Sequence, residues 1–150
     1  MYNYGVGSTT LGSTNDKIVS IVDDEIDITV LFHDALYGNI DGISVVSFID
    51  PVIALAHFKD NKENYALVIC DIRMPGMNGL DFLKKVKNLN RKVRTILITA
   101  YEVEDKVLFE RYSKEGFIDS FMEKPITITR LCQRVRDEFE VYQLALNLKS

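Results

Sequence analysis

The feature of the sequence that most restricts its fold is a regular alternation of short apolar runs with longer amphipathic stretches. The apolar runs are rich in β-branched residues, as expected of strands covered on both faces. In the stretches between them, apolar residues recur every three or four positions, as in helices. The expected strands are Ile18 to Val22, Ile43 to Phe48, Ala66 to Cys70, Val93 to Ile98 and Phe117 to Met122; the expected helices are Ile26 to Tyr37, Val52 to Lys59, Leu80 to Leu89, Val103 to Lys114 and Ile128 to Leu148.

This order predicts an α/β fold, a doubly wound five-stranded parallel sheet flanked by five helices. Right-handed crossovers would bring the C-terminal ends of all the strands to one edge, where open sheets of this kind carry their ligand sites. Residues 1–15 are rich in Gly, Ser and Thr, and we expect a flexible N-terminal lead-in there. Residues 16–148 then form a single domain, which fits a chain of 150 residues.

Composition excludes several classes of function. The chain has 18 Lys and Arg against 22 Asp and Glu, and no block of like charge that could follow a phosphate backbone, so we expect no direct binding to nucleic acid. Cys70 and Cys132 form no CxxC pair, which favours a reducing, cytoplasmic setting. No apolar run approaches the ~18 residues of a membrane span, so no membrane association is expected.

Polar residues follow four of the expected strands. Each one has an ordinary explanation, since Asp24 could cap the next helix, Glu25 could favour its dipole, Asp71 could occupy a turn, and the others could be a strand-end hydroxyl and a solvated cation. The combination is harder to explain in that way, because all of them would meet at one edge of the sheet. They are Asp23, Asp24 and Glu25 after the first strand, Asp71 after the third, Thr99 after the fourth and Lys124 after the fifth.

Carboxylates that converge at one edge repel one another, by roughly 4 kcal/mol for each pair of unit charges ~4 Å apart at an effective dielectric constant near 20. A cation is needed to offset this repulsion, and Mg²⁺ suits because it prefers oxygen ligands and needs only one or two carboxylates plus a phosphate oxygen. Lys124 would supply a second, fixed cation. Asp71, held between them, is the best-placed nucleophile for a phosphoryl group.

At these residues the sequence resembles the response-regulator receiver family of two-component signalling. The resemblance rests on Val22-Asp23-Asp24-Glu25, on the stretch from Asp71 to Gly79 (DIRMPGMNG), on Thr99-Ala100 and on Lys124-Pro125, which occur in the family's order. It covers roughly residues 17 to 146 and implies the flavodoxin-like (βα)5 receiver fold. The Asp71 to Gly79 motif is specific by itself, whereas an Asp-Asp pair or a Lys-Pro dipeptide is common.

The resemblance implies a phosphoacceptor signalling domain and not an enzyme with a separate substrate. It would take a phosphoryl group from a phosphohistidine on a sensor histidine kinase or phosphotransfer protein and then change a protein-interaction surface. A downstream protein would be its target, and a homodimer through the fourth helix, fifth strand and fifth helix is compatible with it. The implied roles are Asp71 as phosphoacceptor, Asp23, Asp24, Asp71 and the Arg73 backbone carbonyl as Mg²⁺ ligands, Lys124 and Thr99 as phosphoryl contacts, Thr99 and Phe121 as the switch pair, and a cis Lys124-Pro125 bond.

Two residues flanking the expected site suggest control over the lifetime of the phosphorylated form. Arg73 lies two positions beyond Asp71, and Tyr101 lies two positions beyond Thr99. A ring at Tyr101 could exclude the attacking water, and a cation at Arg73 could contact the phosphoryl oxygens, so we expect slow hydrolysis.

Alternatives remain open at this point. One is a receiver-fold interaction module whose partner binding does not depend on phosphate, although the complete acidic site argues against it. Another is a phosphohydrolase with an aspartyl-phosphate intermediate, which would need a carboxylate two residues beyond the nucleophile, where this chain has Arg73.

The last helix also leaves two possibilities open. It either frays beyond its apolar stripe, or it extends to pack on a second copy or lead into another domain. The sequence names neither the kinase, the stimulus, the target nor the oligomeric state.

Overall fold

A computed structural model of the chain describes residues 9–10, 15–100 and 106–148. They form one sheet with the strand order β1-β3-β2-β4-β5-β6, in which β2 to β6 run parallel and β1 pairs antiparallel with β3. The strands are β1 (Thr9–Thr10), β2 (Lys17–Val22), β3 (Ile43–Phe48), β4 (Tyr65–Asp71), β5 (Arg94–Thr99) and β6 (Ser120–Glu123). The helices are α1 (Ile26–Asn39), α2 (Pro51–Asn61), a 3-10 turn η1 (Lys62–Asn64), α3 (Gly79–Leu89), α4 (Lys106–Lys114) and α5 (Ile128–Asn147).

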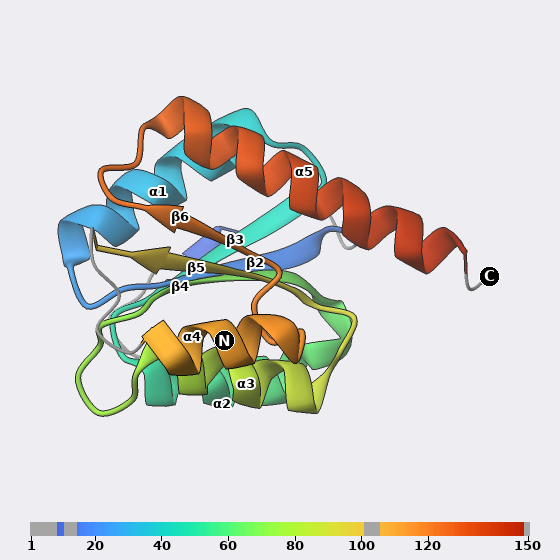
Figure 1. Cartoon of the computed structure of the whole chain (residues 1–150). Coiled ribbons are helices and arrows are strands. Elements are labelled where there is room, and N and C mark those ends of the chain that lie inside the picture. Colours follow the sequence, from blue (N-terminus) through green and yellow to red (C-terminus); the bar gives the residue numbers. More distant parts are fainter. Residues whose placement is uncertain (1–8, 11–14, 101–105, 149–150) are drawn as a thin grey trace.

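The helices cover both faces of the sheet. Figure 1 shows α1 and α5 on one face and α2, α3 and α4 on the other, and each face has its own buried apolar core. Successive strand residues point to opposite faces, so that Ile21 of β2 lies in the core beneath α1 and α5, whereas Val22 lies in the other core. Because both faces are covered, the strands read as continuous apolar runs, and the predicted doubly wound α/β fold is confirmed.

Local signals explain where several helices begin. The Asp50 carboxylate accepts a hydrogen bond from the Val52 N–H at the start of α2, with Pro51 in the first turn, and Asn78 and Thr127 cap α3 and α5 in the same way. Such caps satisfy N–H groups that have no partner within the helix. The expected helices are therefore found with small shifts of their ends.

The largest differences from the sequence-based expectation lie at the N-terminus and at the start of the last strand. The two-residue strand β1 was not predicted, because residues 1–15 had been assigned to a lead-in without regular structure. The last strand begins at Ser120 instead of Phe117, because the Phe117 N–H donates to the Tyr112 carbonyl in the turn after α4. The fourth helix is described from Lys106 onward, and residues 103–105 of the expected helix lie outside the described residues.

The order of the strands places β2 and β4 side by side, at the point where the direction in which the chain adds strands to the sheet reverses. From β2 the chain passes through α1 to β3 on one side, then through α2 to β4 on the other side of β2. Open α/β sheets bind ligands at the carboxyl ends of the strands at such a point. The ends of β2 and β4 are thus where a site is expected.

The final helix, α5, is continuous through Asn147 and projects past the end of the sheet (Figure 1). Tyr142 is still buried against the core, but Leu144 is exposed. In the described part of the chain, no helix combines the length and the apolar character that crossing a membrane would require.

Candidate functional site

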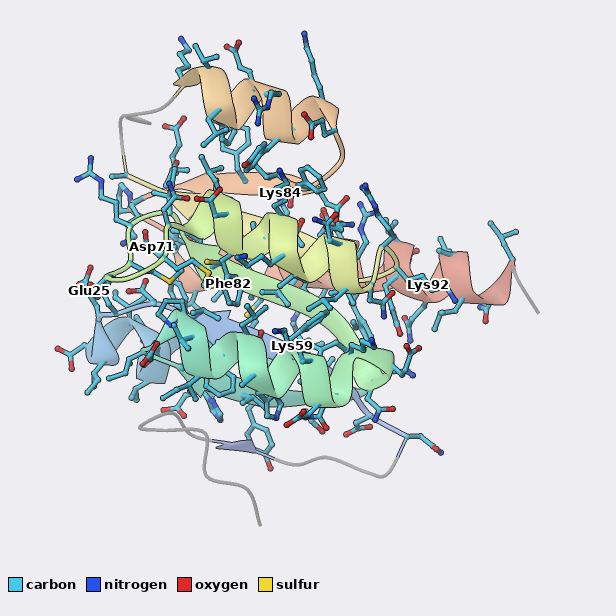
Figure 2. The ribbon with its side chains drawn as sticks, turned by 90° about the horizontal axis from the view of Figure 1, so that it is seen from below. Glu25, Lys59, Asp71, Phe82, Lys84 and Lys92 are labelled. Atoms are coloured by element: carbon cyan, nitrogen blue, oxygen red, sulfur yellow. The ribbon has the colours of Figure 1, made fainter. Side chains whose placement is uncertain are left out.

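Three carboxylates meet at the edge where β2 and β4 end. Asp71 is the last residue of β4, and Asp23 directly follows β2. One carboxylate oxygen from each of Asp23, Glu25 and Asp71 lies within 4.8 Å of the other two. Figure 2 shows Glu25 and Asp71 at the same end of the domain. Asp23 and Asp71 are buried, whereas Glu25 is exposed. The arrangement concentrates negative charge at the predicted edge.

Lys124 lies against all three carboxylates. Its Nζ is 2.6 Å from Asp71 Oδ2, 3.7 Å from Glu25 Oε1 and 4.0 Å from Asp23 Oδ2. The Lys124 N–H donates to the Thr99 carbonyl, which holds the residue after β6 beside the end of β5. Burial by itself would lower the pKa of the ammonium group, but the hydrogen bond to Asp71 and the attraction of the carboxylates outweigh it and raise the pKa above its ordinary value. Lys124 is therefore a permanent cation of the site.

The loop that follows Asp71 is shaped by its backbone. The Arg73 N–H donates to Asp71 Oδ1 at 3.0 Å, and the Gly79 N–H donates to the Ile72 carbonyl at 2.8 Å. A Cβ on Gly79 would overlap the Asp71 carbonyl and lie 2.8 Å from Ile72 Cα, so only glycine fits. Gly76 has a φ of +83°, in the left-handed region that glycine adopts freely. The Asp71 to Gly79 motif thus fixes the orientation of the Asp71 carboxylate.

The Asp23 carboxylate is suited to a cation. Burial raises its pKa to about 7, and repulsion from Asp71 adds to the rise, while the Glu25 N–H and Lys124 lower it. Asp23 Oδ1 accepts the Glu25 N–H at 2.9 Å. Among the residues that the structure describes, Asp23 Oδ2 has no hydrogen-bond donor although it is buried. A buried carboxylate oxygen without a hydrogen bond, together with the two neighbouring carboxylates, offers oxygen ligands that fit a hard divalent cation.

Thr99 and Phe121, the expected switch pair, lie on neighbouring strands: Thr99 ends β5, and Phe121 is the second residue of β6 and pairs with Leu97. Thr99 is fully buried, and its hydroxyl has no hydrogen-bond partner within the described ranges. Phe121 is 45% exposed, and its ring meets that of Phe109 of α4 edge-on, with centroids 5.2 Å apart. Its carbonyl accepts from Arg134 of α5. Phe121 therefore contacts both helices beside β6.

The remaining predicted residues have different surroundings. Asp24 is exposed, and Glu25 takes its place in the three-carboxylate cluster. The alternative in which Asp24 caps α1 is wrong, because the N-cap position belongs to Glu25, whose side chain makes no capping bond. Arg73 is exposed beside Asp71, and Tyr101 lies outside the described residues. The expected cis Lys124-Pro125 bond is confirmed.

Sequence reasoning placed Glu25 at this edge of the sheet but assigned it no role in the site. The one role considered for it was an effect on the dipole of the following helix, whereas its carboxylate lies beside Asp71 and Lys124. The only signal for it was its position next to Asp23 and Asp24 in an uninterrupted acidic triplet.

The structure thus places an acidic cluster with a lysine among its carboxylates at the switch point of the parallel strands β2 to β6. The family model of the response regulator receiver domain matches residues 19–136, and the chain belongs to this family. It is a receiver domain of the two-component response regulators.

Individual relatives agree with this assignment. Sporulation initiation phosphotransferase F of Bacillus subtilis (strain 168) is 32% identical over 136 residues, which cover 91% of this chain and 98% of that protein. The cyclic di-GMP phosphodiesterase response regulator RpfG of Xanthomonas campestris pv. campestris (strain 8004) is 30% identical over 153 residues, and the match covers 97% of this chain. The chain spans only 39% of the length of RpfG.

Solved structures share the fold. A response regulator receiver domain protein from Clostridium thermocellum superposes with a TM-score of 0.76 at 23% identity, over 86% of this chain and 98% of that one. A CheY-like receiver domain protein from Methanospirillum hungatei JF-1 gives a TM-score of 0.74 at 23% identity, over 87% and 98% of the two chains.

Proposed function

We propose that this receiver domain accepts a phosphoryl group on the Asp71 carboxylate from a phosphohistidine of a sensor histidine kinase or phosphotransfer protein. In this step an Asp71 oxygen bonds to phosphorus as the phosphorus–nitrogen bond to the histidine breaks, and the imidazole leaves with the bonding electron pair. The observation that carries the proposal is the position of Asp71, whose carboxylate is fixed by the Lys124 ammonium at 2.6 Å and the Arg73 N–H at 3.0 Å. Alignment and charge neutralisation are the main sources of catalysis in phosphoryl transfer.

Mg²⁺ would be held by Asp23, Asp24, Asp71 and the backbone carbonyl of Arg73. The buried Asp23 Oδ2, which has no hydrogen bond among the described residues, supports this assignment, because hard cations prefer oxygen ligands of this kind. When bound, the ion supplies positive charge to the phosphoryl oxygens. The chain's own residues do the rest: Asp71 is the nucleophile, and Lys124 keeps a second positive charge 2.6 Å from its carboxylate.

Thr99 and Phe121 would convert phosphorylation into a change of surface. The Thr99 hydroxyl is buried and unpaired within the described residues, so a phosphoryl oxygen on Asp71 would give it a hydrogen-bond partner. Phe121 packs on α4 and its backbone binds α5. The affected surface is then α4, β6 and α5, which would bind a downstream protein or a second copy of the chain.

Other properties of the proposed function follow from the family. Assistance to its own phosphotransfer and dephosphorylation would be the only catalysis by the domain, in a cytoplasmic setting. Arg73, and Tyr101 outside the described residues, would set the lifetime of the phosphorylated form. A phosphate-independent interaction module is less well supported, because such a module has no need for a carboxylate fixed between a lysine and a backbone N–H.

Mass spectrometry tests the proposal directly. Incubation with acetyl phosphate and Mg²⁺ should add one phosphoryl group, mapped to Asp71, and the Asp71→Asn variant should remain folded without the added mass. Wild-type incorporation in the variant, or a phosphoryl group on another residue, would end the assignment.

A further inference from the structure

The chain carries one more carboxylate at the site than the proposed metal ligands require. Glu25 is the first residue after the acidic pair and lies immediately before α1. Its Oε1 is 3.7 Å from Lys124 Nζ, and a Glu25 oxygen is within 4.8 Å of oxygens of Asp23 and Asp71. No capping bond engages its side chain, so the carboxylate is not needed to begin the helix.

The charges around Glu25 do not cancel. Asp23, Glu25 and Asp71 carry three negative charges when ionised, and Lys124, the ammonium that meets all three, carries one positive charge. These three carboxylates therefore keep an excess of negative charge, to which the neighbouring Asp24 adds, and a divalent cation would offset it. Attraction between unit charges ~4 Å apart amounts to roughly 4 kcal/mol at the effective dielectric of a protein surface, so the excess negative charge attracts a cation to this position.

A second observation points to a ligand at the same place. Asp23 is 2% exposed, and its Oδ2 has no hydrogen-bond partner among the described residues, the nearest cation being Lys124 Nζ at 4.0 Å. Buried carboxylate oxygens are normally paired or bound to a metal. Asp23 Oδ2, which has no hydrogen bond among the described residues, therefore belongs to the same cluster as the exposed Glu25 carboxylate.

We propose that Glu25 is a further cation-binding residue of this site, which strengthens binding of the divalent ion through its own carboxylate. This inference rests on the proposed function, because it takes the ion of that function as the ligand. The affinity of an oxygen-ligand site rises with the number of charged ligands, and an exposed glutamate side chain can approach an ion without disturbing the sheet. The Asp23 and Asp71 side chains are held in place by their burial, so Glu25 is the one of these three carboxylates whose side chain can change its position to meet the ion.

Calorimetric titration of Mg²⁺ into unphosphorylated protein tests this without any phosphoryl transfer. The Glu25→Gln variant should bind Mg²⁺ at least ~5-fold more weakly than the wild type, because it keeps the size of the side chain and removes the charge. Asp27→Asn is the matched control: Asp27 is exposed in the first turn of α1, two residues away, and is not a member of the cluster. This control should stay within ~2-fold of the wild type, since an exposed charge outside the cluster acts on the ion mainly through water, whose high dielectric constant weakens the interaction.

The possible outcomes are distinct. Equal effects of Glu25→Gln and Asp27→Asn, or no effect of either, would overturn the role of Glu25 while binding by Asp23 and Asp71 stands. A third variant, Asp23→Ala, separates the two ideas: if it binds Mg²⁺ as tightly as the wild type, the ion lies elsewhere, and both the metal site of the proposed function and the role of Glu25 are overturned.

Discussion

The ammonium group of Lys87 in α3 lies 2.7 Å from the carboxylate of Asp119, which directly precedes β6, and both side chains are largely shielded from water. Asp119 also accepts the Thr95 N–H at 2.9 Å and lies 3.5 Å from Arg94, whose Nε donates to Glu138 of α5. Burial lowers the pKa of Lys87, while its bond to Asp119 acts in the opposite direction. An ionic network therefore joins both helical layers through the start of β5.

Asp119→Asn should destabilise the domain by about 3 kcal/mol, because it leaves the Lys87 charge buried without its partner. Urea unfolding measures the change. The control is Glu115→Gln, which breaks the pair between Arg111 and Glu115, whose side chains are 60% and 43% exposed, and should cost no more than about 0.5 kcal/mol. Similar losses in the two variants would show that the buried network contributes no more than a surface pair.

Gly79→Ala should lower both stability and phosphorylation. The added Cβ would overlap the backbone of Asp71 and Ile72, so the loop must shift and carry the Asp71 carboxylate with it, at a cost of about 2 kcal/mol or more. Gly38→Ala is the comparison, because its Cβ meets nothing within 4 Å and it lies in α1, where alanine is preferred by up to ~1 kcal/mol. If Gly79→Ala accepted phosphate at the wild-type rate, the loop would not position Asp71.

Thr99→Val should leave the unphosphorylated domain as stable as the wild type, or up to about 1 kcal/mol more stable. Valine has the same shape and removes a buried hydroxyl that is unpaired within the described residues. On the same strand, Thr95 Oγ1 donates to the Phe117 carbonyl at 2.8 Å, so Thr95→Val should lose about 1–3 kcal/mol. Thermal unfolding of both variants checks the contrast, and a large loss in Thr99→Val would reveal a bond to Oγ1 in the unphosphorylated state.

The stability of the domain should depend on the protonation of His57. Burial lowers the pKa of this side chain below its ordinary value of 6.5, and its Nδ1 lies 2.6 Å from the Tyr65 hydroxyl. As the pH falls below 6.5, the unfolded chain takes up a proton that the folded chain refuses, so acid destabilises the fold. The free energy of unfolding of the wild type should therefore fall relative to that of His57→Gln between about pH 7 and pH 5. Parallel curves for the two proteins would exclude this contribution, and His33, unchanged in both, cancels from the difference.

Arg73→Ala and Tyr101→Ala should each shorten the lifetime of the phosphorylated form. A factor of ten in rate needs only ~1.4 kcal/mol of barrier, which one shielding or charge-pairing side chain can supply. The measurement is the loss of the phosphoryl group after the donor has been removed. If both variants lost the phosphoryl group no faster than the wild type, Arg73 and Tyr101 would not control the lifetime of the phosphorylated form. The role of Asp71 as acceptor would be unaffected.

The fold could be predicted because its signals are local. The run from Ile43 to Phe48 is buried at every position, as expected of a strand between two helical layers, and it was predicted with the correct ends. The meeting of Asp71 and Lys124 also followed from sequence, because parallel strands bring their carboxyl ends to one edge.

What could not be predicted depends on contacts between distant parts of the chain. Thr9–Thr10 joins the sheet through backbone pairing with Val45 and Val46, which requires no pattern of side chains in the added strand. The approach of Glu25 to Lys124 depends on how the chain turns after β2, and no periodicity encodes that turn. The network around Asp119 was missed for the same reason, since its members come from α3, β5, α5 and the segment that precedes β6.

The ion pair between Arg94 and Glu138 divides α5 into two parts of nearly equal length. Glu138 lies near the middle of the helix, so at 1.5 Å per residue the part back to Ile128 is about 15 Å long and the part forward to Asn147 about 14 Å. The first part begins just after Lys124-Pro125, and the second ends beyond the sheet. Buried side chains lie on both sides of Glu138, namely Leu131 and Val135 before it and Phe139 and Tyr142 after it, so a displacement of the helix near the site would have to disturb this packing before it reached the remote end of the domain.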